Sequence, residues 1–225
     1  MGQDNQPKAR QAAQLARKKA QRAGYDRILI VSEGSKTEPH YFGEIRNFHR
    51  LHTANVQLHP SALGTQPLQV VEFAERLFLH GDRAKGVQAR AFEQVYALFD
   101  RDEHPTYHAA LEKAQALQGR LRSDLGVPVR FKAVASVPSF ELWLLLHFED
   151  VLAPMHRTEV HSRLRLHLPD YAKGELGQFA ATRANLGDAM QRAKRLAAMN
   201  SAHDGKQPYT DIHLLVGLLT ALKLA

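Results

Sequence analysis

Residues 28–34 read ILIVSEG, and this short stretch decides the fold class. Four apolar residues, three of them β-branched, run without interruption into Ser32, and Glu33-Gly34 then ends the run. A continuous apolar run of this length predicts a strand that is buried on both faces, as in a parallel sheet. Two similar runs follow at residues 94–99 (QVYALF) and 129–135 (VRFKAVA). We therefore expect a sheet built mainly from parallel strands.

Segments with helical spacing separate these runs. The first, residues 37–50, begins at Thr37, a suitable helix cap, and carries Pro39 in its first turn. The alternation of strands and helices is typical of an α/β fold with a mostly parallel sheet flanked by helices. We also expect helices at 67–79, 107–125 (with Gly126 as the terminal cap) and 140–148, and a short strand at 56–58.

The final third of the chain has a different pattern. No strand is expected after about Pro154, and helices are expected at 158–167, 182–199 and 210–224. The segment before the first strand is rich in Ala, Gln, Lys and Arg and lacks an apolar face. We therefore divide the chain into a basic, flexible N-terminal arm (1–26), an α/β core (27–150) and a helical C-terminal subdomain (151–225).

The composition excludes several kinds of chemistry. The chain has 225 residues and no Cys, so disulfides, thiolate zinc sites and a cysteine nucleophile are impossible. No signal-peptide core is recognisable near the start, and apolar stretches such as 142–146 are too short to cross a bilayer. We expect a soluble, cytoplasmic protein that does not contact a membrane.

The charge is distributed unevenly along the chain. The formal net charge of +7 divides into +5 for residues 1–27, −2 for 28–150 and +4 for 151–225. An acidic centre between basic flanks suits a metal site with surroundings that bind a polyanion. An ordinary basic protein with a solvated tail has the same pattern, so charge alone leaves both interpretations open.

Carboxylates follow three of the expected strands. Glu33 ends the first run, Asp100 and Asp102 follow the second, and Glu141 comes soon after the third. Ligand sites in parallel sheets gather at the carboxyl ends of the strands, so these groups should converge. Asp100 and Asp102, two residues apart, should face the same side at the end of their strand. An all-carboxylate cluster favours a hard ion such as Mg²⁺ or Mn²⁺.

Each of these features also has a simpler interpretation. Asp102 could cap a helix, and Glu141 could interact with the dipole of its own helix. Asp-x-Asp also occurs in sugar-nucleotide transferases and in phosphatases with an aspartyl nucleophile, and Glu-Gly is a common turn. The 13 histidines are scattered and are expected on the surface; His104 and His147 lie nearest the predicted site.

Six segments of the chain carry recognisable motifs: 28–34, 36–38, 41–42, 99–104, 136–148 and 208–216. Taken together, these motifs resemble those of RloB-like proteins, in the same order and over residues 27 to about 220. The resemblance implies a Toprim-type fold for the core, in which Glu33, Asp100 and Asp102 form the catalytic metal site and Glu33 is a proposed general acid or base. Glu141 could complete a second metal position. Lys36 and Arg101 are the expected phosphate contacts, although a solvated lysine is the alternative for Lys36.

The resemblance also implies a function. Such proteins are presumed to be nucleases of prokaryotic anti-phage or abortive-infection systems, often encoded beside an ABC-type ATPase. We therefore expect a metal-dependent nuclease that cleaves DNA or RNA, with Mg²⁺ or Mn²⁺ as cofactor and such an ATPase as partner. One alternative is a non-catalytic module that binds nucleic acid or docks on the ATPase. A second is a Mg²⁺-dependent phosphotransferase or phosphatase that uses Asp100.

Overall fold

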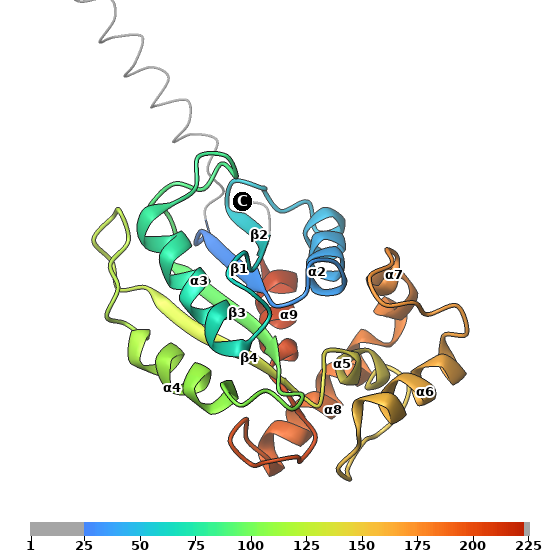
Figure 1. Ribbon diagram of the computed structural model, residues 1–225. Coiled ribbons are helices and arrows are strands. Elements are labelled where there is room, and N and C mark those ends of the chain that lie inside the picture. Colours follow the sequence, from blue (N-terminus) through green and yellow to red (C-terminus); the bar gives the residue numbers. More distant parts are fainter. Residues whose placement is uncertain (1–24, 223–225) are drawn as a thin grey trace, which may run out of the picture.

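A computed structural model describes residues 25–222 of the protein. Its centre is a sheet in which three neighbouring pairs of strands are parallel and the last pair is antiparallel (Figure 1). This confirms the predicted α/β class with a mostly parallel sheet. The predicted arm lies outside the described residues, apart from Tyr25 and Asp26. In spatial order the strands are β2 (Val56–Pro60), β1 (Ile28–Ser32), β3 (Gln94–Asp100), β4 (Arg130–Val137) and β5 (Tyr209–Thr210).

The continuous apolar run of β1 packs into two hydrophobic clusters, one on each face of the sheet. Ile28 and Ile30 belong to one cluster, and Leu29 and Val31 belong to the other. Successive side chains of a strand point to opposite faces, so both faces of this strand are covered. Helices α3 (Pro67–His80) and α4 (Tyr107–Leu117) cover the face of Leu29 and Val31. Helices α2 (Thr37–Phe48) and α9 (Ile212–Ala221) cover the opposite face (Figure 1).

The C-terminal helices share a hydrophobic cluster with the sheet. The remaining elements are α5 (Glu141–Leu145), α6 (Arg157–His167), α7 (Gln178–Thr182), the short helix η1 (Arg183–Asn185) and α8 (Leu186–Met199). Phe42 of α2, Trp143 of α5 and Leu215 of α9 belong to one buried cluster, so the core continues across the boundary between residues 150 and 151. Helix α9 contacts β4 and α2, and α5 contacts α6 and α8.

Several predicted boundaries are wrong. Helix α4 ends at Leu117 rather than at 125, because the Gln118 side chain accepts a hydrogen bond from Phe131 N–H (3.0 Å) and the chain turns back towards β4. The predicted helix 182–199 is α8 preceded by η1 and α7, and α5 is shorter than 140–148. Strand β5 contradicts the expectation of no strand after Pro154. It was not predicted because two residues are too few to give a sequence pattern.

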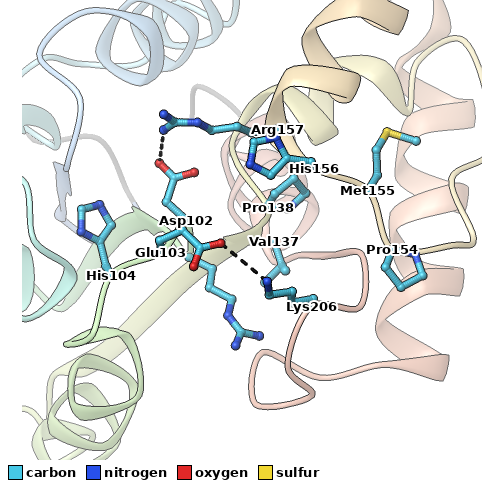
Figure 2. Close-up of a pocket in the computed structure, with 11 residues that line it drawn as sticks. Asp102, Glu103, His104, Val137, Pro138, Pro154, Met155, His156, Arg157 and Lys206 are labelled. Atoms are coloured by element: carbon cyan, nitrogen blue, oxygen red, sulfur yellow. Dashed lines mark hydrogen bonds and ion pairs between the residues drawn. The ribbon is translucent and has the colours of Figure 1, made fainter.

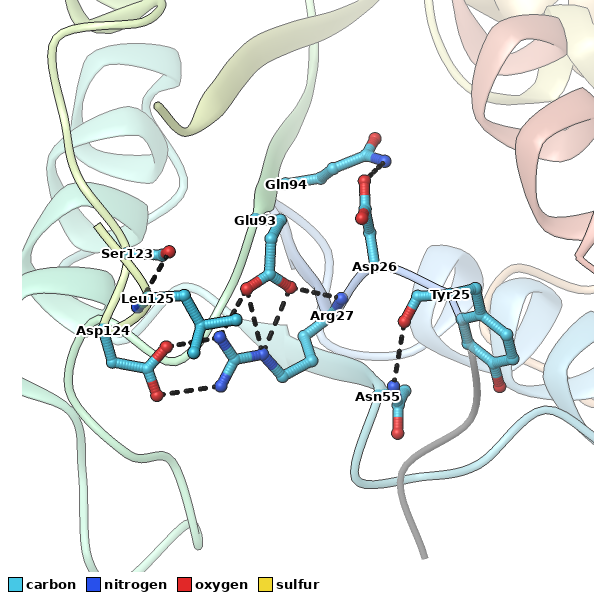
Figure 3. Close-up of polar contacts among 9 residues, drawn as sticks. All are labelled: Tyr25, Asp26, Arg27, Asn55, Glu93, Gln94, Ser123, Asp124 and Leu125. Atoms are coloured by element: carbon cyan, nitrogen blue, oxygen red, sulfur yellow. Dashed lines mark hydrogen bonds and ion pairs between the residues drawn. The ribbon is translucent and has the colours of Figure 1, made fainter. Parts of the chain in front are cut away.

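Arg27 joins the beginning of β1 to the segments before β3 and β4 (Figure 3). Its guanidinium forms ion pairs with both Glu93 and Asp124, and its backbone N–H donates to Glu93 Oε2 at 2.7 Å. Arg27 is 5% exposed. This network therefore stabilises the edge of the sheet opposite to the carboxyl ends. No helix within residues 25–222 is long and apolar enough to cross a bilayer.

Candidate functional site

Four carboxylates gather at the carboxyl edge of the sheet. Glu33 follows β1, Asp100 is the last residue of β3, and Glu141 begins α5 after β4. Because these strands are parallel, their ends meet at one edge. The fourth carboxylate, Glu38, lies in the first turn of α2, and sequence reasoning did not assign it to the site. Asp100, Glu38 and Glu141 are buried, which is unusual for ionisable groups.

Glu33 is tied directly to the end of the neighbouring strand. Its Oε2 accepts a hydrogen bond from the backbone N–H of Asp100 at 3.0 Å, and its Oε1 lies 3.7 Å from Nε2 of His104. Burial raises the pKa of Glu33 to about 7, and the nearby charges of Glu38 and Asp102 act in the same direction. Glu33 can therefore take up or release a proton near neutral pH.

Glu38 and Asp100 repel each other inside the fold. Burial raises the pKa of both groups, Glu38 and Glu141 raise that of Asp100, and Glu141 raises that of Glu38. Gly34 leaves the space that Glu38 needs, since a Cβ at Gly34 would lie 2.3 Å from Glu38 Oε2. The Glu33-Gly34 sequence is therefore more than a turn signal. The glycine allows a second carboxylate into the site.

Glu141 is the one carboxylate of this cluster with a shell of donors. It is fully buried, and burial alone would raise its pKa, but His161, Lys173 and Ser139 outweigh burial and lower the pKa to about 2. Glu141 is thus held as an anion. The distances to its carboxylate oxygens are 2.7 Å from Ser139 Oγ, 3.0 Å from the Tyr171 hydroxyl, 3.3 Å from His161 Nε2 and 3.7 Å from Lys173 Nζ.

Lys173 brings a cation to the acidic edge from far along the chain. Burial would lower its pKa, but the charges of Glu141, Asp100 and Glu38 raise it. The next residue, Gly174, has φ +86°, and a Cβ there would lie 3.0 Å from the Lys36 side chain. The segment that carries Lys173 therefore packs against the exposed Lys36 at the start of α2. No sequence pattern around residue 173 indicates this position.

Asp102 does not follow the geometry expected from its strand. β3 ends at Asp100, and Asp102 has φ +36°, a left-handed conformation that is uncommon outside glycine. Its N–H donates to the Pro138 carbonyl at 3.3 Å, and its carboxylate forms an ion pair with Arg157 at 2.8 Å. The alternation of a strand therefore cannot place Asp100 and Asp102 on the same side. Asp102 still acts on Glu33 through its charge.

A pocket of about 470 Å³ opens beside Asp102 (Figure 2). An ion pair between Glu103 and Lys206 at 3.6 Å also lies at this pocket. The apolar lining of the pocket comes from the end of β4 and from the segment that precedes α6. The lining residues are Arg101, Asp102, Glu103, His104, Val137, Pro138, Pro154, Met155, His156, Arg157 and Lys206.

The acidic edge suits a hard cation in its chemistry. Its donors are carboxylate oxygens, the ligands that Mg²⁺ and Mn²⁺ prefer. Burial, and after it the charges of neighbouring carboxylates, raises the pKa values of Glu33, Glu38 and Asp100, so their ionised forms are disfavoured unless a cation lies among them. Within residues 25–222, no three His, Asp or Glu side chains are already arranged around a single ion position. Ion binding would therefore require these side chains to turn towards one another.

The histidine expectation is wrong for two residues. His147 is 1% exposed, its Nδ1 lies 3.0 Å from the Trp143 carbonyl, and burial lowers its pKa to about 4. His213 is buried as well. His104 contacts Glu33 as expected from its position, and His161 contacts Glu141, a pairing that no sequence pattern indicates.

The fold and this edge define an α/β protein with a buried acidic cluster at the carboxyl ends of a parallel sheet. The sequence profile described as RloB-like protein matches residues 28–219, which is most of the chain. The protein therefore belongs to the RloB-like family. No curated protein and no solved structure gives a significant match to it.

Proposed function

We propose that this protein is a metal-dependent nuclease that hydrolyses phosphodiester bonds of DNA or RNA at the acidic edge. The observation that carries this proposal is the gathering of Glu33 and Asp100, at the ends of adjacent strands, with Glu38 of the first turn of α2, all with raised pKa values. Buried carboxylates that repel one another cost stability unless a cation neutralises them, so their presence favours a functional role.

The proposed roles follow from these positions. Glu33 and Asp100 would hold Mg²⁺ or Mn²⁺, with Glu38 and Asp102 beside them. A bound ion of this kind would polarise a phosphate oxygen and make water more acidic. The pKa of Glu33, about 7, describes the metal-free site, and a bound cation would favour its ionised form and hold it as a ligand beside Asp100. Glu141, fully occupied by its donors, would position α6 and Lys173 rather than bind the ion directly.

Phosphate contacts would come from cations around the edge. Lys36 is exposed at the start of α2, beside the segment that carries Lys173. Arg101 lines the pocket next to Asp102. The Arg101 guanidinium also lies 5.6 Å from the centre of the Tyr107 ring, and its Nη1 is buried. We keep Lys36 and Arg101 as proposed phosphate contacts and add Lys173 as a third.

The cellular part of the proposal depends on the family alone. We propose that the nuclease is an effector of a prokaryotic anti-phage or abortive-infection system and works with an ABC-type ATPase encoded nearby. Its support is membership of the RloB-like family together with the resemblance of the motifs. Co-expression with the neighbouring ATPase should then be toxic for the wild type and harmless for an Asp100→Asn variant.

Cleavage assays on the purified protein test the chemical part. Labelled DNA and RNA, single-stranded and duplex, are incubated with Mg²⁺ or Mn²⁺, with Zn²⁺ alone, and with EDTA. We expect cleavage only with Mg²⁺ or Mn²⁺, reduced by orders of magnitude in Asp100→Asn. Glu112→Gln, on the exposed face of α4, is the matched control and should cleave normally.

The same assays separate the alternatives. Full cleavage in EDTA, or full activity of Asp100→Asn, would overturn the proposed site. Toxicity in cells that Asp100→Asn retains would favour a binding module. An acid-stable phosphate attached to Asp100 would favour the phosphotransferase or phosphatase, since the proposed hydrolysis forms no aspartyl-phosphate.

A further inference from the structure

The pocket beside the acidic edge shares residues with the candidate active site. Asp102 lines the pocket and influences the charge of Glu33. His104 also lines the pocket, and its Nε2 lies 3.7 Å from Glu33 Oε1. A molecule in this pocket would therefore lie directly next to the proposed reacting phosphate.

One wall of the pocket is apolar. Val137 and Pro138 at the end of β4 and Pro154 and Met155 before α6 contribute to it (Figure 2). A pocket of about 470 Å³ lies within the size range of small-ligand sites. Proline rings and a thioether offer a polarisable apolar surface on which the face of a heterocyclic base can pack.

Exposed cations line the same pocket. Arg157 pairs with Asp102 and Lys206 pairs with Glu103, and the two basic side chains are 55% and 79% exposed. Exposed ion pairs of this kind are weak, so both cations can also contact a phosphate oxygen in the pocket. Arg101 differs, because its Nη1 is buried and its guanidinium lies 5.6 Å from the centre of the Tyr107 ring.

We infer that this pocket binds one unpaired nucleotide of a single-stranded nucleic acid, with the base on the apolar wall and a phosphate oxygen at Arg157 and Lys206. This inference rests on the proposed function, because it places that nucleotide beside the phosphate to be cleaved. The bases of a duplex are stacked on both faces and cannot pack against the wall unless they are flipped out, so the pocket selects single-stranded substrates.

Binding in EDTA tests the pocket independently of any cleavage. The full chain is titrated, with fluorescence anisotropy as the readout, into a labelled single strand of about 12 nucleotides and into its duplex. Met155→Asp places a charge on the wall, and Pro154→Asp does so at an exposed position, where folding is not at risk. Leu152→Asp, 59% exposed on the same segment but outside the pocket, is the matched control.

We expect the wild type to bind the single strand more tightly than the duplex. Both pocket variants should weaken single-strand binding by about 5-fold, the lower end of the range for base stacking because the wall is not aromatic, while duplex binding changes little. Leu152→Asp should behave like the wild type. Unchanged single-strand binding by Pro154→Asp, or equal losses for strand and duplex, would overturn the inference. AMP that binds without competing with the strand would also overturn it. Normal binding without cleavage in Mg²⁺ would contradict the proposed function alone.

Discussion

Replacing Glu33 by Gln should make the protein more stable at alkaline pH in the absence of metal. The carboxylate is mostly buried, and burial together with the charges of Glu38 and Asp102 disfavours its ionised form. The glutamine side chain of the variant would carry no charge, yet its amide oxygen could still accept the hydrogen bond from Asp100 N–H. The substitution therefore removes repulsion while it keeps the link between β1 and β3.

The size and sign of the expected change in stability follow from the pKa of Glu33, which rises from 4.5 to about 7 in the folded protein. Below 4.5 the group is protonated in both the folded and unfolded states, and no charge is buried. Between 4.5 and 7 the unfolded chain releases the proton while the folded protein keeps it, so stability falls as pH rises. The shift corresponds to at most about 3 kcal/mol, and we expect Glu33→Gln to recover about 1–3 kcal/mol above pH 7.

Urea unfolding in EDTA at about pH 5.5 and about pH 8.5 measures this difference. The free energy of unfolding of Glu33→Gln should exceed that of the wild type at the higher pH, and the gap should narrow at the lower pH. Glu112→Gln, exposed on α4, controls for the loss of one surface charge. Equal pH dependence of wild type and Glu33→Gln, or a variant that is less stable than the wild type at about pH 8.5, would show that the ionised Glu33 carboxylate does not destabilise the fold.

Three further predictions concern other parts of the molecule. Glu141→Gln should lower the free energy of unfolding by about 3 kcal/mol at neutral pH, because it leaves buried donors unpaired. The contribution of the Glu141 carboxylate to stability should disappear as pH falls from 4.5 towards 2. A variant as stable as the wild type at neutral pH would contradict this prediction. Arg27→Met should lower the free energy of unfolding by about 3–5 kcal/mol, seen as a lower urea midpoint, because Glu93 and Asp124 lose their cation. Arg120→Met, at an exposed position, is the control. An unchanged midpoint in Arg27→Met would contradict the prediction. Deletion of residues 7–22 should flatten the plot of log K for nucleic-acid binding against log salt concentration, by about 0.9 in slope per lost duplex phosphate contact. The melting temperature of the protein should stay unchanged. An unaltered slope would exclude phosphate contacts by this segment.

The sequence predicted the parallel sheet and the edge at which the carboxylates meet. Both follow from local patterns: the run before Glu33 is too apolar for a half-exposed strand, and parallel topology brings Glu33, Asp100 and Glu141 to one edge. The division into arm, core and subdomain stays a prediction, although one hydrophobic cluster spans both sides of its second boundary.

The remaining features depend on contacts that no local pattern encodes. Glu38 has the sequence position of an ordinary first-turn acid, and only Gly34 beside it makes room for it in the site. Lys173 reaches Glu141 from a loop without regular spacing. Asp102 leaves the strand geometry because its backbone binds Pro138 and its side chain binds Arg157. Each depends on tertiary packing that becomes defined only in the folded chain.

Metal binding by the purified protein is the decisive measurement, since the proposed nuclease requires the acidic edge to hold a divalent ion. Mn²⁺ is titrated into the wild type, Asp100→Asn and Glu112→Gln, and free Mn²⁺ is followed by electron paramagnetic resonance. We expect saturable binding of Mn²⁺ by the wild type and by Glu112→Gln, displaced by Mg²⁺ and lost in Asp100→Asn. Absence of saturable binding by the wild type, or equal binding by Asp100→Asn, would contradict it.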